Sequence, residues 1–299
     1  MSEPAVAETT TLTDIPTRVL VLGMAHQDGT IHGEELYPVA EACGQTTEQV
    51  RSCLRRLVAE GLFTRSGEGR EAVFLPTAAG RSALDTYVER TKLAYAQDAA
   101  GRGWDRRWRL VAFAVPEHQR AARDGFRDRL RLLGGAALQN GLYVSPHPWD
   151  QHVTEVAEHL GVADHVITGT TDDLVVGGER DPRALAQKLW PLEEVAFRYE
   201  EFLAEYGRMP HVLSEMRQRR ERLPETDFLP GALSMGVAFQ RCFDQDPLLP
   251  PELLPRPWPG RTAREVVAES HRLALLAREQ HTHPALFRYY AEVAAAVHT

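Results

Sequence analysis

The sequence has few cysteines and no long apolar run. Its three cysteines, Cys43, Cys53 and Cys242, show no C-x-x-C spacing, which argues against a disulfide framework and a cysteine-based zinc site. The longest apolar stretch near the N-terminus, Val19–Ala25, is far shorter than the ~20 residues that a membrane-spanning helix needs. The first fifteen residues lack the basic start and apolar segment of a secretory signal. We therefore expect a folded cytoplasmic protein.

Motifs of the common enzyme classes are also absent. The sequence has no G-x-S-x-G, Walker A, H-E-x-x-H or dinucleotide-binding fingerprint. His281-Thr282-His283 could supply two metal ligands, but it precedes Pro284 between two predicted helices, and a solvated helix junction explains it more simply. We expect neither catalysis nor a metal site nor a cofactor.

Lysine is nearly absent, so arginine supplies almost all of the positive charge. Only Lys92 and Lys188 are lysines among the 34 basic residues, a bias that a GC-rich genome would explain. The formal net charge of −8 at first argues against a nucleic-acid partner, but phosphates respond to the local field. Residues 51–70 carry five arginines against two acids, and residues 102–131 carry nine against four. A local surface that faces DNA remains compatible with this distribution.

The first eighty residues read as three helices followed by a hairpin. Helices are predicted from Thr17 to the turn at Asp28-Gly29, over Gly33–Cys43 and over Thr47–Glu60. Thr46 and Gln49 have the spacing of a capping box at the start of the third helix. Strands are predicted over Leu62–Arg65 and Ala72–Leu75, on either side of the glycine-rich tip Ser66–Arg70. This order is typical of a winged helix-turn-helix, whose third helix enters the major groove.

The third predicted helix has two different faces. The stripe that we expect to be buried is Val50, Leu54, Leu57 and Gly61. Arginine on the opposite face and on the hairpin suits phosphate contacts and readout of guanine, although a charged helix face is often only a solvated one. The predicted DNA-binding residues are Thr46, Thr47, Glu48, Arg51, Ser52, Arg55, Arg56, Arg65 and Arg70. Of these, Arg51, Ser52 and Arg55 should face the major groove, and Arg65 and Arg70 should contact phosphates.

A long helix, Ala78–Ala99, leads to a second domain. Its predicted elements are strand Arg109–Val115, helix Glu117–Leu133, two strands within Ala136–Ser145, helix Asp150–Leu160 and strand His165–Thr168. The order β-α-β-β-α-β is that of a ferredoxin-like unit.

The remainder is predicted to be mostly helical. The predicted helices are Pro182–Trp190, Leu192–Tyr206, Pro210–Arg222, Pro230–Phe243, Arg261–Arg278 and His283–Val297. The proline-rich segment Asp246–Gly260 should be extended, with Leu253, Leu254 and Trp258 as apolar anchors. The chain is thus predicted to be an α+β protein with five parts: a disordered N-terminus 1–16, a winged helix-turn-helix 17–77, a linker helix 78–103, a ferredoxin-like domain 104–180 and a helical C-terminal domain 181–299.

Three blocks of sequence carry a family resemblance. The first is Val50–Leu62. The second comprises Trp108–Leu110, Pro116-Glu117, Arg120, Arg123 and Gly141–Pro146, and the third is the proline-rich segment from Asp246 to Gly260. On these residues the chain resembles the PaaX family, repressors of phenylacetic acid catabolic operons. The resemblance implies a homodimeric transcriptional repressor that phenylacetyl-CoA releases from operator DNA. It also implies a middle domain like that of a CRISPR-associated endoribonuclease. The hairpin departs from the family pattern after Arg70, where Glu71 follows.

An aryl acyl-CoA effector would need arginines for its phosphates and aromatic side chains for its ring. The predicted effector-binding residues are Arg107, Trp108, Arg109, Arg241 and Trp258, although either tryptophan could simply anchor domain packing. Two alternatives remain: a regulator of this family that answers another small ligand, and a ferredoxin-like nucleic-acid-processing protein. The predicted strand Arg109–Val115 has no carboxylate for a nuclease metal, which argues against the second.

Overall fold

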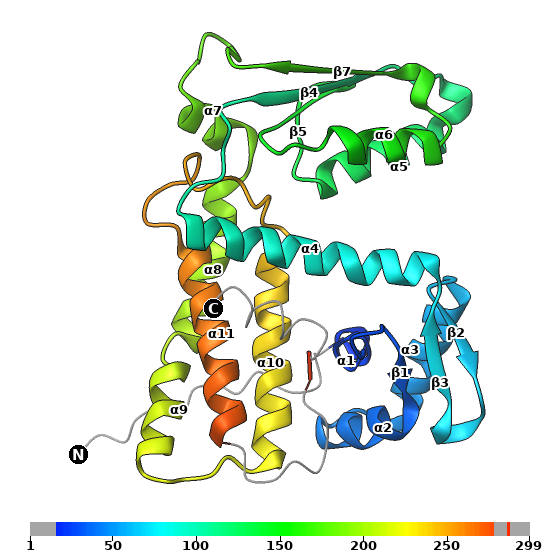
Figure 1. Cartoon of the computed structure of the whole chain (residues 1–299), viewed down its shortest axis with the longest axis vertical. Helices are drawn as coiled ribbons and strands as arrows, with labels where there is room; N and C mark the ends of the chain where they lie inside the picture. The colour runs from blue at the N-terminus through cyan, green and yellow to red at the C-terminus, as the bar shows by residue number, and fades with distance from the viewer. Residues whose placement is uncertain (1–15, 278–285, 288–299) are drawn as a thin grey trace. The chain divides into compact units, whose positions relative to one another are not determined.

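The computed structural model describes residues 16–277 and 286–287 (Figure 1). They form two compact units. The first joins the described residues up to Tyr95 with residues 201–241 and those from Thr262 onward, and the second joins residues 96–200 with 242–261. The predicted domain 181–299 is therefore divided between the two units. Outside the described residues lie the N-terminal segment 1–15, His281-Thr282-His283 and all but two residues of the predicted helix His283–Val297.

The first unit begins with the predicted helices and hairpin. Its elements are α1 (Thr17–Gly23), β1 (Ile31–His32), α2 (Gly33–Ala42), α3 (Thr47–Ala59), β2 (Phe63–Ser66) and β3 (Val73–Pro76). The bounds of α2, α3, β2 and β3 agree with the prediction to within one residue. The short strand β1 was not predicted, and it pairs with β3 in an antiparallel sheet of order β1-β3-β2. A two-residue strand gives no periodic signal, so only its distant partner defines it.

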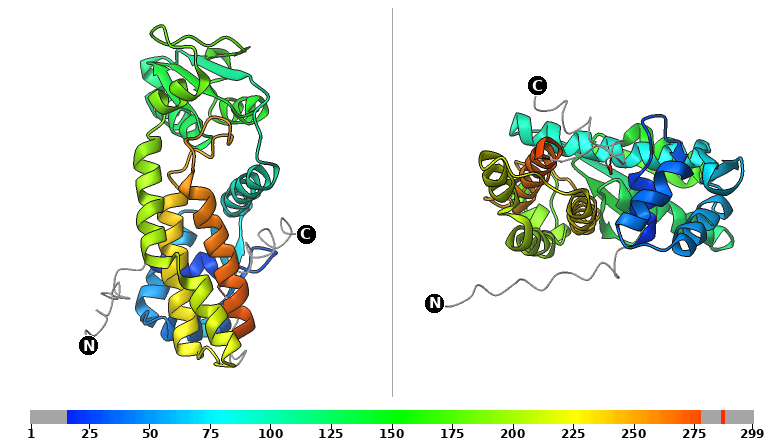
Figure 2. Two further views of the ribbon diagram at one scale, coloured as in Figure 1. Left: turned by 90° about the vertical axis from the view of Figure 1, so that its left-hand side faces the viewer. Right: turned by 90° about the horizontal axis from the view of Figure 1, so that it is seen from below.

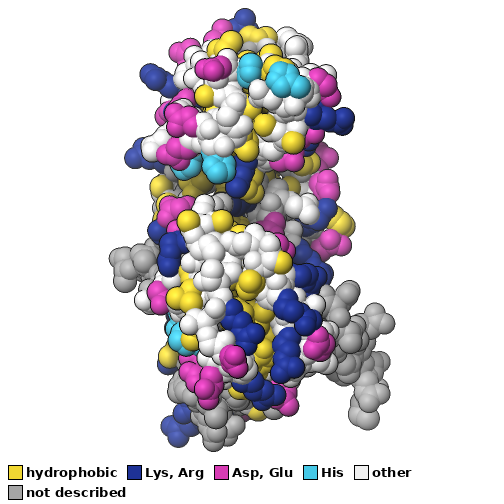
Figure 3. Space-filling view, turned by 90° about the vertical axis from the view of Figure 1, so that its right-hand side faces the viewer, with side chains coloured by type: hydrophobic (Ala, Val, Ile, Leu, Met, Phe, Trp, Pro, Cys, Tyr) yellow, Lys and Arg dark blue, Asp and Glu magenta, His cyan; other side chains and the backbone are white. Residues whose placement is uncertain are grey.

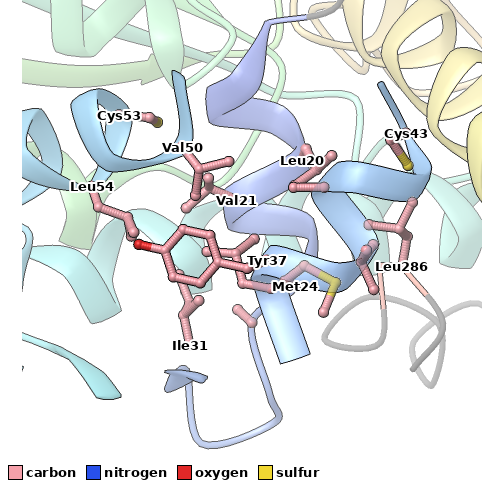
Figure 4. Close-up of a cluster of buried hydrophobic side chains, with 14 of the residues drawn as sticks. Leu20, Val21, Met24, Ile31, Tyr37, Cys43, Val50, Cys53, Leu54 and Leu286 are labelled. Atoms are coloured by element: carbon pink, nitrogen blue, oxygen red, sulfur yellow. The ribbon is translucent and has the colours of Figure 1, made fainter. Parts of the chain in front are cut away.

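One hydrophobic core holds these helices together (Figure 4). Val50, Leu54 and Leu57 of α3 are all at most 3% exposed, which confirms most of the predicted buried stripe. The exception is Gly61, which is exposed beyond the end of α3, where its φ of +72° favours glycine. Helices α10 (Glu225–Phe243) and α11 (Pro259–Ala277) run alongside each other (Figure 2). α10 adds Phe228, Leu229, Leu233 and Val237 to the same core.

Helix α4 (Ala78–Ala100) leads to the second unit, which contains a four-stranded sheet. Its elements are β4 (Trp108–Phe113), α5 (Arg120–Leu132), β5 (Ala136–Gln139), β6 (Leu142–Ser145), α6 (Asp150–His159) and β7 (Val166–Thr171). The strand order is β5-β6-β4-β7, with every neighbouring pair antiparallel. The predicted order β-α-β-β-α-β is confirmed. Phe126 and Leu130 of α5 and Val153 of α6 pack with strand residues in one buried cluster.

The remaining helices are α7 (Pro182–Leu189), α8 (Leu192–Tyr206) and α9 (Met209–Gln218). Helix α10 starts five residues before the predicted Pro230, because a proline near the start of a helix removes only one internal hydrogen bond. In the proline-rich segment, Leu253 and Leu254 are buried as predicted. In the part of the chain that the structure describes, no helix is both long and apolar enough to span a membrane.

Candidate functional site

The start of α3 is fixed by a reciprocal cap. The Thr46 hydroxyl accepts a hydrogen bond from the Gln49 backbone N–H at 3.2 Å, and the Gln49 side-chain oxygen accepts one from the Thr46 N–H at 2.7 Å. The predicted capping box is confirmed. The Thr46 side chain is therefore used by the helix itself, while Thr47 is half-buried.

The outer face of α3 presents three exposed arginines, Arg51, Arg55 and Arg56. Within residues 16–277 and 286–287, neither Arg51 nor Arg56 takes part in an ion pair. Ser52 is only half-buried, between the arginines and the core stripe. Because this face is opposite Val50 and Leu54, the core fixes it in position and leaves the guanidinium groups in solvent.

Arg55 differs from its neighbours because it has an acidic partner on the same helix. Its Nη2 lies 2.8 Å from Oε1 of Glu48, and the two side chains are 70% and 69% exposed. The residues are two helical turns apart, so the Arg55 side chain extends along α3 toward its N-terminal end. An exposed pair of this kind contributes at most about 1 kcal/mol, so a stronger acceptor can break it.

The β2–β3 hairpin carries the other two predicted phosphate contacts. Arg65 is exposed on β2, and Arg70 is exposed in the short 3-10 turn that precedes β3. The Arg70 guanidinium lies 5.6 Å from the ring centroid of Tyr37, an otherwise buried residue of α2. This cation–π contact holds the hairpin against α2. No sequence pattern predicts this contact, because the two residues are far apart in the chain and Tyr37 has the pattern of a core residue only.

Figure 3 shows the side of the molecule on which β2 and β3 lie in Figure 1. Lys and Arg side chains gather in the lower half of this view. The exposed arginines of the first unit come from both α3 and the β2–β3 hairpin. Their charge is local, since the whole chain has a formal net charge of −8.

In the second unit, two predicted effector residues contribute to one hydrophobic cluster. Trp108 is only 1% exposed and packs between Trp104, at a centroid distance of 5.2 Å, and Trp190, at 6.3 Å. Trp258 is half-buried against the same cluster, and its ring contacts Tyr199 at 6.2 Å. Trp108 therefore has the packing role that was the alternative to a ligand contact. Trp258 packs too, but part of its side chain remains exposed.

The predicted effector arginines have different surroundings. Arg109 is 8% exposed and donates to both carboxylate oxygens of Asp105, with Nη1 to Oδ1 at 2.7 Å. It also donates to the carbonyls of Arg107 and Pro146. The Arg109 hydrogen bonds hold the pKa of the Asp105 carboxyl below its usual value. Arg107 is exposed, and Arg241 is exposed near the end of α10 in the first unit.

Among the described residues, the thiols and the possible metal ligands form no second candidate site. All three cysteines are buried, and burial raises the pKa of the Cys43 thiol to about 12. Such a thiol stays protonated and is a poor nucleophile or metal ligand. No group of three His, Cys, Asp or Glu side chains in the described residues is placed to hold a metal ion.

Two domain models of one family match adjacent parts of the chain. The PaaX protein central Cas2-like domain matches residues 101–186, and the PaaX-like protein C-terminal domain matches residues 190–283. The chain belongs to the PaaX family. The resemblance seen in the sequence is thereby confirmed, and the central PaaX domain covers the whole sheet from β4 to β7.

Similar proteins of known sequence or structure were also found. The transcriptional repressor PaaX of Escherichia coli (strain K12) is 29% identical over 243 residues, which cover 81% of this chain and 74% of the relative. Among solved structures, the uncharacterized protein Rv0674 from Mycobacterium tuberculosis matches with a TM-score of 0.48 and 21% identity. That match covers 89% of this chain and 90% of the other.

Proposed function

We propose that this PaaX-family protein is a DNA-binding transcriptional repressor. The observation that carries the proposal is the outer face of α3, where Arg51, Arg55 and Arg56 are exposed on a helix whose other face is buried. The order α1-β1-α2-α3-β2-β3 supports a winged helix-turn-helix, in which α3 enters the major groove and the hairpin is the wing. The name of the E. coli relative supports the same function.

In this proposal, the side chains of α3 and those of the wing contact different parts of the DNA. Arg51, Ser52 and Arg55 read base edges, since they occupy the outer part of α3. Arg65 and Arg70 on the wing contact phosphates and set the orientation on the duplex. The rest of the proposed surface comprises Thr46, Thr47, Glu48 and Arg56.

Enrichment of duplexes from a random pool by the full-length chain tests this function. We expect a defined sequence to emerge after several rounds of selection. The double variant Arg51→Ala/Arg55→Ala should enrich nothing, because it lacks two of the proposed base-reading side chains. A wild-type chain that enriches no sequence would refute the proposal.

The proposed effector is phenylacetyl-CoA or a close aryl acyl-CoA thioester. Arg107 and Trp258 are the predicted contacts that the geometry favours, because both retain exposed surface. Arg109 and Trp108 would act by positioning them, since Asp105 and the tryptophan cluster already occupy these side chains. Arg241 stays a prediction from sequence.

We also propose that the repressor is a homodimer. Paired half-sites on DNA normally require two copies of a small reading domain. In the described sheet, β7 has β4 as its single partner strand, and Ile167 on β7 is 72% exposed. An open strand edge can pair with a second chain. Light scattering that shows only monomers, at concentrations where DNA is bound, would exclude the dimer.

A further inference from the structure

We propose that Glu48 determines sequence specificity by restraining Arg55, an inference that rests on the proposed DNA-binding function. The two side chains lie on the same side of α3, with 2.8 Å between Nη2 of Arg55 and Oε1 of Glu48. About 70% of each side chain is exposed, so DNA can reach both of them. The pair occupies Nη2 of Arg55, so it must break or rearrange before Arg55 can make a bidentate contact through that nitrogen.

The chemistry of DNA decides which contacts replace the pair. Guanine offers O6 and N7 to an arginine in the major groove, and its paired cytosine offers an N4 amine to a carboxylate. A G·C base pair can therefore satisfy Arg55 and Glu48 together. A phosphate satisfies only Arg55 and brings a second negative charge close to the Glu48 carboxylate. Glu48 thus disfavours contacts between Arg55 and the DNA phosphates, while contacts to a G·C pair remain favourable. A repulsive group creates specificity in this way.

The neighbouring arginines lack such a restraint. Arg51 and Arg56 have no ion-pair partner among the residues described, so no acidic side chain competes with DNA for their guanidinium groups. Of the three exposed arginines on this face of α3, Arg55 is thus the one whose contacts an acidic neighbour restrains.

The chain contains a matched control pair in the same unit. Arg18 of α1 donates to both carboxylate oxygens of Glu60, at 3.0 and 2.7 Å, and both side chains are 45% exposed. Glu60 follows the end of α3 and is rotated by more than a third of a turn from Arg55. Its removal changes the charge of the domain as the removal of Glu48 does, but does not release Arg55.

The test compares E48Q with E60Q in the full-length chain. Dissociation constants are measured by fluorescence anisotropy at one salt concentration, for the duplex that the wild type enriches and for a scrambled duplex of equal composition. We expect E48Q to bind the scrambled duplex more tightly, so that the specificity ratio falls roughly three- to ten-fold. E60Q should keep the ratio within about two-fold of the wild type. Circular dichroism melting confirms that both variants are folded.

The same substitution in an R55Q background isolates the role of Arg55. If Glu48 acts through Arg55, adding E48Q to R55Q leaves the specificity ratio unchanged. The proposal would be overturned if E48Q did not lower the specificity ratio, or if E60Q lowered it as much as E48Q does. It would also be overturned if E48Q lowered the ratio further in the R55Q background. A wild-type chain that enriches no sequence would instead refute the DNA-binding function itself, so the two failures are distinct.

Discussion

The arginine side chains on the proposed DNA-contacting surface differ in the contacts that they make within the protein. Arg55 is paired with Glu48, Arg70 lies over the Tyr37 ring, and Arg65 extends from β2 into solvent. These surroundings lead us to expect different binding phenotypes when each side chain is removed.

Arg55→Ala should weaken binding to the enriched duplex by about 1–3 kcal/mol and affect a scrambled duplex less, because a base contact is lost. Arg65→Ala should weaken both duplexes alike and reduce the salt slope by about one, because a phosphate contact is lost. Anisotropy titrations over a range of salt concentrations separate the two effects. If Arg55→Ala bound the enriched duplex as tightly as the wild type does, α3 would not be the recognition helix.

We expect His271 on α11 to make the stability of the protein depend on pH. Burial lowers the pKa of this imidazole below its usual 6.5, and its Nε2 has no hydrogen-bond partner among the described atoms. The unfolded chain therefore binds a proton more readily than the folded one. The stabilisation from a neutral His271 is present above the unfolded pKa and is lost as the pH falls through 6.5 toward the lowered folded value.

Thermal unfolding should therefore show a lower Tm at about pH 5.5 than at about pH 7.5. His271→Leu should flatten this dependence, because the variant lacks the buried imidazole. A His271→Leu protein with the same pH dependence as the wild type would assign the effect to other groups.

At the scale of elements, the start of α4 is packed directly on the hairpin. A Cβ atom at Gly80 would lie 1.9 Å from the carbonyl oxygen of Leu62, which also accepts a hydrogen bond from the Thr77 N–H at 2.9 Å. The hairpin and α4 therefore meet at a point where only glycine fits.

Gly80→Ala should lower the free energy of unfolding by about 1–3 kcal/mol, because the added methyl group forces backbone to move. Gly231→Ala is the matched control, since a Cβ there meets nothing within 4 Å in the exposed part of α10. It should raise stability by about 0.5–1 kcal/mol through helix propensity. Urea unfolding measures the free energy of unfolding of both variants. A Gly80→Ala protein as stable as the wild type would contradict the packing described.

Local patterns predicted most elements because their causes are local. The capping box at Thr46 and the spacing of Val50, Leu54 and Leu57 fixed the extent and the buried face of α3. Strand β1 was not predicted, because it is a strand only through its pairing with β3, some forty residues later in the chain.

The same distinction applies to the candidate site. Helical periodicity predicted which side of α3 carries exposed arginines, and the structure agrees for Arg51, Arg55 and Arg56. It did not predict that Glu48 holds Arg55 or that Tyr37 holds Arg70, because those contacts depend on side-chain conformation and tertiary packing. Whether these residues bind DNA stays a prediction.

At the scale of the whole molecule, the effector must couple to DNA binding. Phenylacetyl-CoA should weaken binding to the enriched duplex by a coupling on the order of 1–3 kcal/mol, and DNA must weaken effector binding equally. Free phenylacetate should have no such effect, because it lacks the phosphates that an arginine binds.

The variant Arg107→Ala should keep its affinity for DNA but lose the response to the thioester. Arg102→Ala, at another exposed arginine in the segment between α4 and β4, is the matched control and should respond as the wild type does. Calorimetry with the thioester, repeated with DNA present, measures the coupling. No heat with any aryl acyl-CoA would favour a regulator of this family that answers another ligand.

The most direct test of DNA recognition is a titration of the full-length chain with the DNA immediately upstream of its own gene. A shuffled duplex of equal length and composition serves as the reference, both at physiological salt. We predict that the upstream duplex binds at least about 10³-fold more tightly, as specific regulators do. Equal affinity for the two duplexes, or no binding to either, would contradict the assignment of a sequence-specific repressor.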